Sequence, residues 1–258
     1  MSSENPYSAP LSALVDVRTT EQRQEFRSPQ ALRTAVISLL VIMSVVSVLT
    51  IVTMALLQQS LQQFESHQFE SAQAIRSVLT SRGRMQAALS GLQLLLIVAT
   101  YVASGMWIYR VACNVRAFGA RGLDDTPGWA VGWYAIPFMN LQRPFRAMEQ
   151  IWLASQSPLG WQKLAAPLLL RLWWGSWLVM CFHGAFVMRT FGSHHTVPEM
   201  ISSESTLMLG QALEIIARLC FLVVVIRLTR MQIEQHERAA TPPPLNIDMA
   251  KLPSVVTS

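Results

Sequence analysis

Four long apolar stretches dominate the pattern of hydrophobic and polar residues along the chain. They occupy residues 35–57, 87–109, 168–188 and 207–226. The first two carry no charged side chain, the third contains Arg171 and His183, and the fourth contains Glu214 and Arg218. A helix of roughly 20 apolar residues crosses the hydrocarbon core of a bilayer. The pattern therefore predicts four transmembrane helices.

A shorter apolar segment lies between the second and third stretches. Residues 129–141 are too few to cross a bilayer as a helix, but enough to lie at the membrane surface or to dip into it. Trp129, Trp133 and Tyr134 suit the headgroup region, where amphipathic rings collect. Pro137 is expected to bend the segment. We predict an interfacial element here rather than a fifth span.

The next segment has helical periodicity. Phe145, Met148 and Trp152 share one helical face, whereas Arg146 and Glu149 lie away from it. A helix with one apolar and one charged face can lie in the plane of the membrane surface. We therefore expect an in-plane amphipathic helix.

Together these patterns predict an all-α membrane protein with four transmembrane helices and an interfacial Trp-rich segment between the second and third. The expected divisions are an N-terminal cytoplasmic tail at 1–33, a transmembrane domain at 34–238 and a disordered cytoplasmic tail at 239–258. Three consecutive prolines at 242–244 end the last helical pattern.

Composition excludes several classes of protein. Hydrophobic residues make up 52% of the chain and charged residues 14%, against about 25% charged residues in typical soluble domains. An ordinary soluble enzyme and a disordered chain are both disfavoured. Lysine and arginine outnumber acidic residues 20 to 15, but cationic loops beside membrane helices account for this excess without a nucleic-acid partner.

The cations are distributed unevenly between the two predicted sides. The two tails and the middle loop hold 14 of them, whereas the loops on the opposite side hold four, Arg76, Arg82, Arg84 and Arg189. Cationic loops stay in the cytoplasm, so both termini are expected there, in a multi-pass protein of a bacterial inner membrane. The first apolar stretch follows more than 30 residues that include Glu4 and Glu25, which predicts an uncleaved anchor.

A string of Trp, Gly, Pro and Asn residues runs through the middle of the chain. Its members in order are Trp107, Arg110, Asn114, Pro127-Gly128-Trp129-Ala130, Gly132-Trp133, Ile136-Pro137, Asn140-Leu141, Pro144, Trp152, Leu169-Leu170 and Trp173-Trp174. Over residues 85–230 the chain resembles the bacterial membrane family catalogued as domain of unknown function 4328. The resemblance implies a polytopic membrane protein and brings no activity with it.

Ionisable side chains inside the spans are candidate functional residues because they are costly to place in lipid. Glu214 and Arg218 are one helical turn apart, and Gln211 lies on the same side of the fourth span. Gln93 begins a polar stripe on the second span that continues at Thr100 and Ser104. Two interpretations are open. The residues form a polar path or proton-sensitive switch, or they form a structural ion pair with hydrogen bonds that hold the helices together.

The inner end of the second span holds further candidates. Arg110 and Asn114 are one turn apart, and Arg110 is suited either to a lipid phosphate or to a backbone carbonyl of the Trp-rich segment. Within that segment, Trp129, Trp133 and Asn140 are candidate functional or structural positions.

The chain carries no familiar catalytic or metal-binding motif. HExxH, GxGxxG, Walker A and GxSxG are absent from the sequence. The spacing of the histidines matches no standard metal site, and His183 has no second intramembrane histidine for a haem. We therefore expect no enzyme, no cofactor and no metal.

The leading functional hypothesis is a non-enzymatic interaction or scaffold protein. Its expected partners are membrane lipids, with other membrane proteins or a second copy of the chain as further candidates. The alternative is a small-solute or ion transporter that uses the polar stripes. A continuous water-lined cavity at Glu214 favours transport, whereas a large exposed apolar or aromatic patch without a cavity favours interaction.

The charge distribution yields a topology prediction. Single cysteines placed at 110–166 in a variant lacking Cys113, Cys181 and Cys220 should resist a membrane-impermeant thiol reagent added outside intact cells. Cysteines at 58–84 or 189–205 should react, because the positive-inside rule places these loops outside. Rapid labelling of the middle loop from outside would contradict the orientation.

Overall fold

The computed structural model describes residues 25–65, 72–190 and 197–241, and within these ranges the chain is helical. The helices are α2 (Gln30–Glu65), α3 (Ala72–Ala117), α4 (Pro127–Gly132), α5 (Arg143–Gln156), α6 (Leu168–Thr190) and α7 (Val197–Ala240). Three 3-10 turns join them, η1 (Trp133–Ala135), η2 (Met139–Leu141) and η3 (Trp161–Lys163). The predicted disorder of the C-terminal tail falls almost entirely outside the described residues.

Three helices are long and apolar enough to cross a membrane. They contain the segments Gln30–Ser60, Thr80–Ala117 and Ser202–Ala240. Helix α6 coincides with the third predicted span but is not among these three, and Arg171 and His183 interrupt its apolar residues. The described chain thus has three helices that could cross a membrane, one fewer than the four that the sequence predicts.

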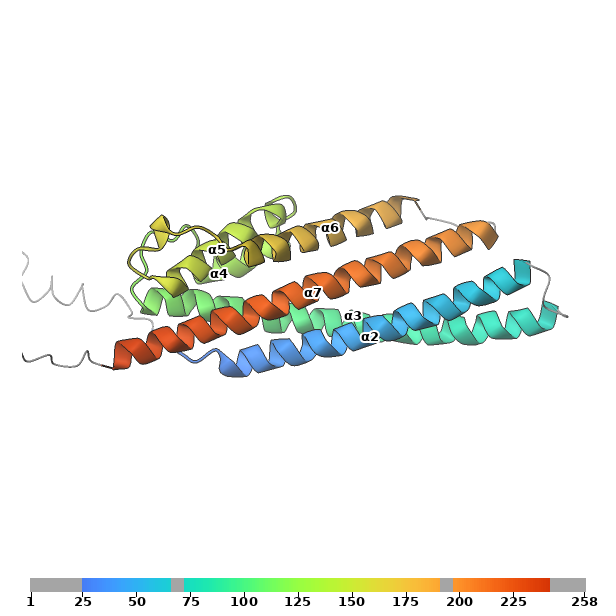
Figure 1. Ribbon diagram of the computed structural model, residues 1–258, viewed down its shortest axis with the longest axis horizontal. Helices are drawn as coiled ribbons and strands as arrows, with labels where there is room; N and C mark the ends of the chain where they lie inside the picture. Colours follow the sequence, from blue (N-terminus) through green and yellow to red (C-terminus); the bar gives the residue numbers. More distant parts are fainter. Residues whose placement is uncertain (1–24, 66–71, 191–196, 242–258) are drawn as a thin grey trace, which may run out of the picture.

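The long helices lie side by side along the molecule (Figure 1). Helix α2 packs against α3 and α7, and α7 packs against α6. Helices α4 and α5 and the 3-10 turns gather where α3 ends and α6 begins, which we call the capped end. The described chain also begins and ends at the capped end.

Large apolar side chains are exposed along the outer faces of the long helices. Examples on α3 are Leu94, Leu95, Val98 and Val102, and examples on α6 are Phe182, Phe186 and Met188, each with more than half of its surface accessible. A monomeric soluble protein rarely exposes a contiguous apolar surface of this kind. These faces suit contact with lipid.

The turn from α3 into α4 is encoded by local residues. Gly119 adopts a φ of +87°, which glycine tolerates best, and the amide of Ala120 donates to the carbonyl of Val115 across 3.1 Å. Helix α4 then begins after Thr126, whose hydroxyl accepts from the amide of Trp129 at 3.3 Å. The chain therefore reverses quickly and returns toward the bundle.

The Trp-rich segment is bent, as predicted. It runs from α4 through η1 to a turn at Pro137 and Phe138, where Phe138 has a φ of +66°, and then into η2. The indole of Trp174 on α6 donates to the carbonyl of Leu141 at 3.1 Å. The segment is therefore attached to the start of α6.

The prediction of an in-plane amphipathic helix for α5 was wrong about what covers its apolar face. Met148 and Ile151 are buried in the main core, and Trp152 is 3% exposed. Helix α5 packs against α3 and α7, so its apolar face contacts protein rather than lipid. Helical periodicity identifies the apolar face of α5, but it does not specify whether that face contacts protein or lipid.

Buried amide side chains hold the capped end together. The side chain of Asn114 on α3 donates to the Gln232 side chain on α7 at 2.9 Å and to the carbonyl of Arg27 at 3.0 Å. Gln232 donates to the Val111 carbonyl and to the Ser155 hydroxyl, both at 3.0 Å. Both amide side chains are fully buried, so these bonds replace those that water would make.

The start of the described chain belongs to this assembly. Phe26 stacks on His236 with ring centroids 4.0 Å apart, and the amide of Arg27 donates to Asn114. Residues 25–29, assigned to the tail from the sequence, therefore contact the bundle, and residues 1–24 lie outside the described part.

We predict that Gln232→Leu lowers the free energy of unfolding by about 2 kcal/mol, because it leaves the amide of Asn114 and the hydroxyl of Ser155 without their buried partner. Thermal unfolding in detergent measures the change. Gln235→Leu on the partly exposed side of α7 is the control and should change stability little. Equal stability of the two variants would contradict a structural role for the network.

Candidate functional site

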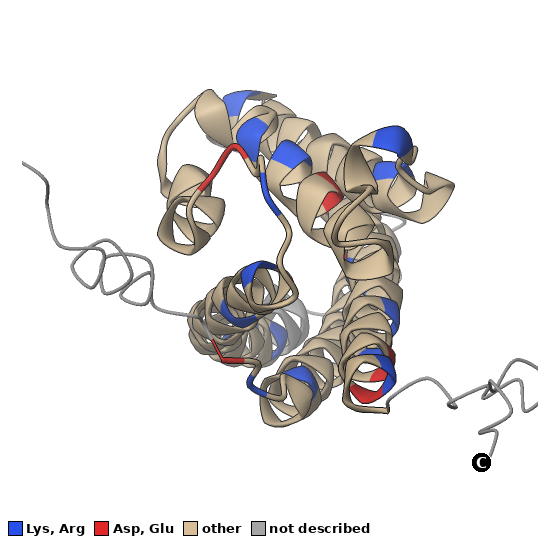
Figure 2. Ribbon diagram, turned by 90° about the vertical axis from the view of Figure 1, so that its left-hand side faces the viewer, with Lys and Arg blue, Asp and Glu red and all other residues tan. Residues whose placement is uncertain are grey.

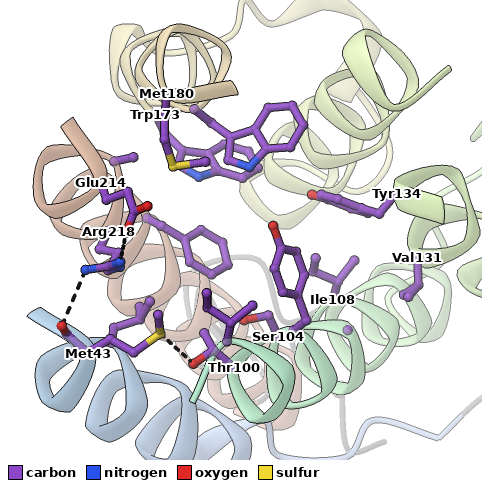
Figure 3. Close-up of a pocket in the computed structure, with 17 residues that line it drawn as sticks. Met43, Thr100, Ser104, Ile108, Val131, Tyr134, Trp173, Met180, Glu214 and Arg218 are labelled. Carbon is purple, nitrogen blue, oxygen red and sulfur yellow. Dashed lines mark hydrogen bonds and ion pairs between the residues drawn. The ribbon is translucent and has the colours of Figure 1, made fainter. Parts of the chain in front are cut away.

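A cleft of about 250 Å³ lies between the long helices, on the side of the capped end (Figure 3). Helices α2, α3, α6 and α7 all contribute to its wall, and Val131 and Tyr134 close it from the Trp-rich segment. The cleft forms because α3 packs on α2 and α6 packs on α7, whereas α3 and α6 do not pack closely on each other in the described part of the chain. Residues of all four long helices therefore meet at this cleft.

Aromatic and aliphatic side chains make up most of the cleft wall. Trp173 on α6 stacks on Phe221 of α7, with centroids 5.3 Å apart and ring planes 23° apart. Tyr101 of α3 and Trp177 of α6 add further rings. These residues come from three helices and form flat apolar surfaces within the bundle.

The ion pair predicted between Glu214 and Arg218 is present and lines the cleft. The guanidinium also donates to the Met43 carbonyl at 3.4 Å (Figure 3). It donates as well to the Ser47 hydroxyl at 2.7 Å, and both acceptors are on α2. The Arg218 side chain is 11% exposed and that of Glu214 30% exposed. The pair is therefore hydrogen-bonded across two helices, and the carboxylate is the more accessible member.

The other predicted polar residues of the spans extend this group. The Gln93 amide on α3 donates to the Gln211 carbonyl oxygen on α7 at 3.0 Å and lies 3.4 Å from the Ser47 hydroxyl. Three helices thus meet through side-chain hydrogen bonds beside the ion pair. The structure thus brings Gln211 of the fourth predicted span together with Gln93, the first residue of the polar stripe on the second.

Two hydroxyl groups of the cleft are buried and have no hydrogen-bond partner among the described residues. They belong to Ser104 on α3, which is 9% exposed, and to Tyr134 of η1. Figure 3 shows the Tyr134 side chain pointing into the cleft. Burial raises the pKa of the Tyr134 hydroxyl further above its ordinary value, so this group remains a neutral donor. Buried polar groups normally have partners, which makes both hydroxyls candidate ligand contacts.

The remaining candidates from the sequence lie away from the cleft. Asn114 belongs to the buried amide network of the capped end. Arg110 is partly exposed and forms no hydrogen bond or ion pair with the described residues, so its suggested bond to a carbonyl of the Trp-rich segment is not formed there. Asn140 contributes only its backbone amide, which donates to the Ile136 carbonyl.

The two tryptophans of the Trp-rich segment pack together on the surface. Trp129 is 50% exposed, and its ring lies 4.7 Å from that of Trp133. The Trp133 indole donates to the Asp125 carboxylate at 2.8 Å, and the Arg143 guanidinium lies 5.2 Å from the Trp133 ring. These contacts fix the shape of the segment and do not reach the cleft.

Sequence analysis missed the aromatic wall and the role of Tyr134. Tyr101, Trp173 and Phe221 look like ordinary apolar residues of three separate spans, and no local spacing relates them. His183 was noted only as a lone histidine. It lies against Gly210, where an added Cβ would come within 3.0 Å of the ring, so glycine permits the close approach of α6 and α7.

Comparison with known proteins identifies the family. The family model described as Domain of unknown function (DUF4328) matches residues 71–230, so the chain belongs to this family, in agreement with the resemblance seen in the sequence. No curated protein and no solved structure matches the chain. The matched region includes most of the cleft wall and ends before the buried Gln232.

The geometry of the ion pair predicts an asymmetric effect of substitution. Glu214→Gln should destabilise the protein by about 2 kcal/mol, because Arg218 keeps its charge with only Ser47 and Met43 as acceptors. The double variant with Arg218→Gln should be less destabilised, because no charge is left unpaired. Thermal unfolding of the parent, both single variants and the double variant makes the comparison. A Glu214→Gln protein as stable as the parent would contradict the pairing argument.

Proposed function

We propose that this member of the domain of unknown function family is a non-enzymatic, four-span protein of a bacterial inner membrane that binds a lipid-soluble molecule in the cleft between α3 and α6. The single observation that carries the proposal is the cleft itself. It has mainly apolar walls, lies among helices long enough to cross a membrane, and contacts one internally neutralised ion pair. Such a site suits a hydrophobic molecule better than a hydrated solute.

The path of the chain supports α6 as a fourth span. Helix α3 ends at the capped end, whereas α7 begins at the opposite end of the molecule (Figure 1). The chain therefore has to return along the bundle between them, and α6 supplies 23 residues, about 34 Å at 1.5 Å per residue. This length is close to the roughly 30 Å of a hydrocarbon core.

The distribution of charge supports a cytoplasmic capped end. Figure 2 looks onto that end and shows arginine and lysine residues on several of its elements. Most of the 20 cations of the chain lie in segments that belong to this end. Phe138 and Leu159 there are 83% and 89% exposed, which suits side chains that meet the headgroup region of a bilayer. We place the Trp-rich segment at that interface.

The chemistry of the cleft supports binding rather than catalysis. Glu214 and Arg218 are bonded to each other, so neither is free as a general acid or base. The hydroxyls of Ser104 and Tyr134 lack the neighbouring base that would activate a nucleophile within the described residues. What the cleft offers is shape, apolar surface and hydrogen-bond donors.

A transporter for a small solute or ion is the second candidate. Its support is the side-chain network of Gln93, Gln211 and Ser47 next to the ion pair, which places polar groups from three helices in the middle of the bundle. A path for a hydrated solute has to continue through both ends of the bundle. The capped end closes one side with the buried residues Trp107 and Leu228, which favours binding over conduction.

The proposal predicts that a lipid acyl chain enters the cleft. The protein in vesicles containing a phosphatidylcholine with a photoreactive group in its acyl chain should be labelled after illumination at cleft residues such as Tyr101 and Trp173. Ala217→Phe places a ring in the cleft and should reduce this labelling several-fold. Ala55→Phe, on an exposed face of α2, should leave it unchanged.

Mass spectrometry of the labelled peptides decides the outcome. Cleft labelling no greater than that of the outward residues Leu95 and Val98, and insensitive to Ala217→Phe, would contradict entry of a lipid acyl chain into the cleft. Melting temperatures of both variants establish that each protein is folded.

A further inference from the structure

The two unpartnered hydroxyls of the cleft indicate the polar chemistry of its ligand. Ser104 and Tyr134 reach the same cleft from α3 and from the Trp-rich segment, and each hydroxyl is buried without a partner in the described chain. A buried hydroxyl that gives up water without a replacement bond costs free energy. A ligand with hydrogen-bond-accepting oxygens would remove this cost at both positions.

The walls indicate the shape of the ligand. Trp173 and Phe221 stack on each other and both line the cleft, so part of its wall is an aromatic surface. The ring of Tyr134 projects into the cleft from another side (Figure 3). Aromatic side chains contact planar rings favourably through offset or edge-on packing. A flexible acyl chain needs no such surface, so the walls favour a flat ring.

The charge of the cleft favours an uncharged ligand. Arg218 already bonds Glu214, Ser47 and the Met43 carbonyl, and the carboxylate of Glu214 is neutralised by Arg218. A charged headgroup would have to displace one of these partners in a medium of low polarity. A neutral carbonyl oxygen needs only the free hydroxyl donors.

The size and position of the cleft fit one ring with a tail outside. Its volume of about 250 Å³ lies just below the range of typical small-molecule pockets, about 300–1,000 Å³. The helices beside it expose apolar side chains, among them Val98 and Val102 on α3 and Phe182 on α6. A hydrophobic tail can therefore extend from the cleft along surfaces that suit lipid.

From these features we propose that the cleft holds the ring of a lipid-soluble quinone, with its two carbonyl oxygens accepting hydrogen bonds from Ser104 and Tyr134. The inference rests on the proposed function, since it names the class of hydrophobic molecule that the cleft binds. It concerns binding, and no electron transfer is part of it.

The test is a titration of the purified full-length protein in nanodiscs with decylubiquinone, a quinone with a ten-carbon tail. Quenching of tryptophan fluorescence reports binding, because Trp173 lines the cleft. The parent should bind saturably. Tyr134→Phe and Ser104→Ala should each weaken binding roughly three- to tenfold, the loss expected for one hydrogen bond.

Matched control variants test whether the effect is specific to the two cleft hydroxyls or follows from removing any hydroxyl. Tyr109→Phe removes an exposed tyrosine hydroxyl of α3, and Ser44→Ala removes a serine of α2 that bonds the Leu40 carbonyl; neither residue lines the cleft. Both should bind decylubiquinone like the parent. Ala217→Phe should abolish saturable binding by filling the cleft. If Tyr134→Phe or Ser104→Ala does not fold, this variant still tests whether decylubiquinone binds in the cleft.

The outcomes distinguish this inference from the proposed function. If the photoreactive phospholipid labels the cleft but decylubiquinone does not bind, the quinone assignment is overturned and the lipid-binding function stands. If neither binds, both are overturned. Binding that persists unchanged in Tyr134→Phe, Ser104→Ala and Ala217→Phe would place the quinone elsewhere and reject the inference.

Discussion

The contact of α7 with α2 through Arg218 is the interaction on which the arrangement of the helices depends. A guanidinium in an apolar bundle must be surrounded by acceptors, and Arg218 finds them in Glu214 of its own helix and in Ser47 and Met43 of α2. This requirement fixes the rotation and the height of α7 relative to α2. Because α7 also packs against α5 and α6, it sets where those helices lie.

The cleft follows from this arrangement and from the capped end. Helices α3 and α6 pack on α2 and α7 respectively, and the Trp-rich segment lies near both at one end. Helix α4 approaches α3 closely at Gly105, where an added Cβ would come within 3.3 Å of the Val131 side chain. The segment therefore closes the cleft at the capped end and brings Tyr134 into its wall. The hydrogen-bond donors of the cleft thus come from two parts of the chain, Ser104 from the long helix α3 and Tyr134 from the Trp-rich segment.

The buried amides of the capped end and the polar side chains of the cleft have different roles. The amides of Asn114 and Gln232 are fully buried and fully bonded, which is the state expected of a structural network. The cleft has a satisfied ion pair on one side and two unsatisfied hydroxyls on another. The amide network thus suits a structural role, whereas the two free hydroxyls of the cleft suit contact with a ligand.

A continuous water-lined cavity that touches Glu214 would favour transport, and a large exposed apolar or aromatic patch without a cavity would favour interaction. The cleft combines features of both, because it touches Glu214 yet has mainly apolar walls. Apolar walls cannot replace the hydrogen bonds that water or a hydrated ion would lose in the cleft. A lipid-soluble molecule has few such bonds to lose. The cleft therefore suits a bound hydrophobic ligand better than it suits a hydrated solute.

The sequence by itself determined the features that arise within a few helical turns. Apolar runs located the long helices, Pro137 located the bend, and the spacing of Glu214 and Arg218 gave their pairing, because each depends on neighbours along the chain. It also located the helix after Pro144 but not what covers it, since periodicity marks a face and not its partner. The tertiary structure decided the rest. Asn114 meets Gln232, Gln93 meets Gln211, and Ser104 shares a cleft with Tyr134 only when helices distant in sequence adopt one particular rotation and height.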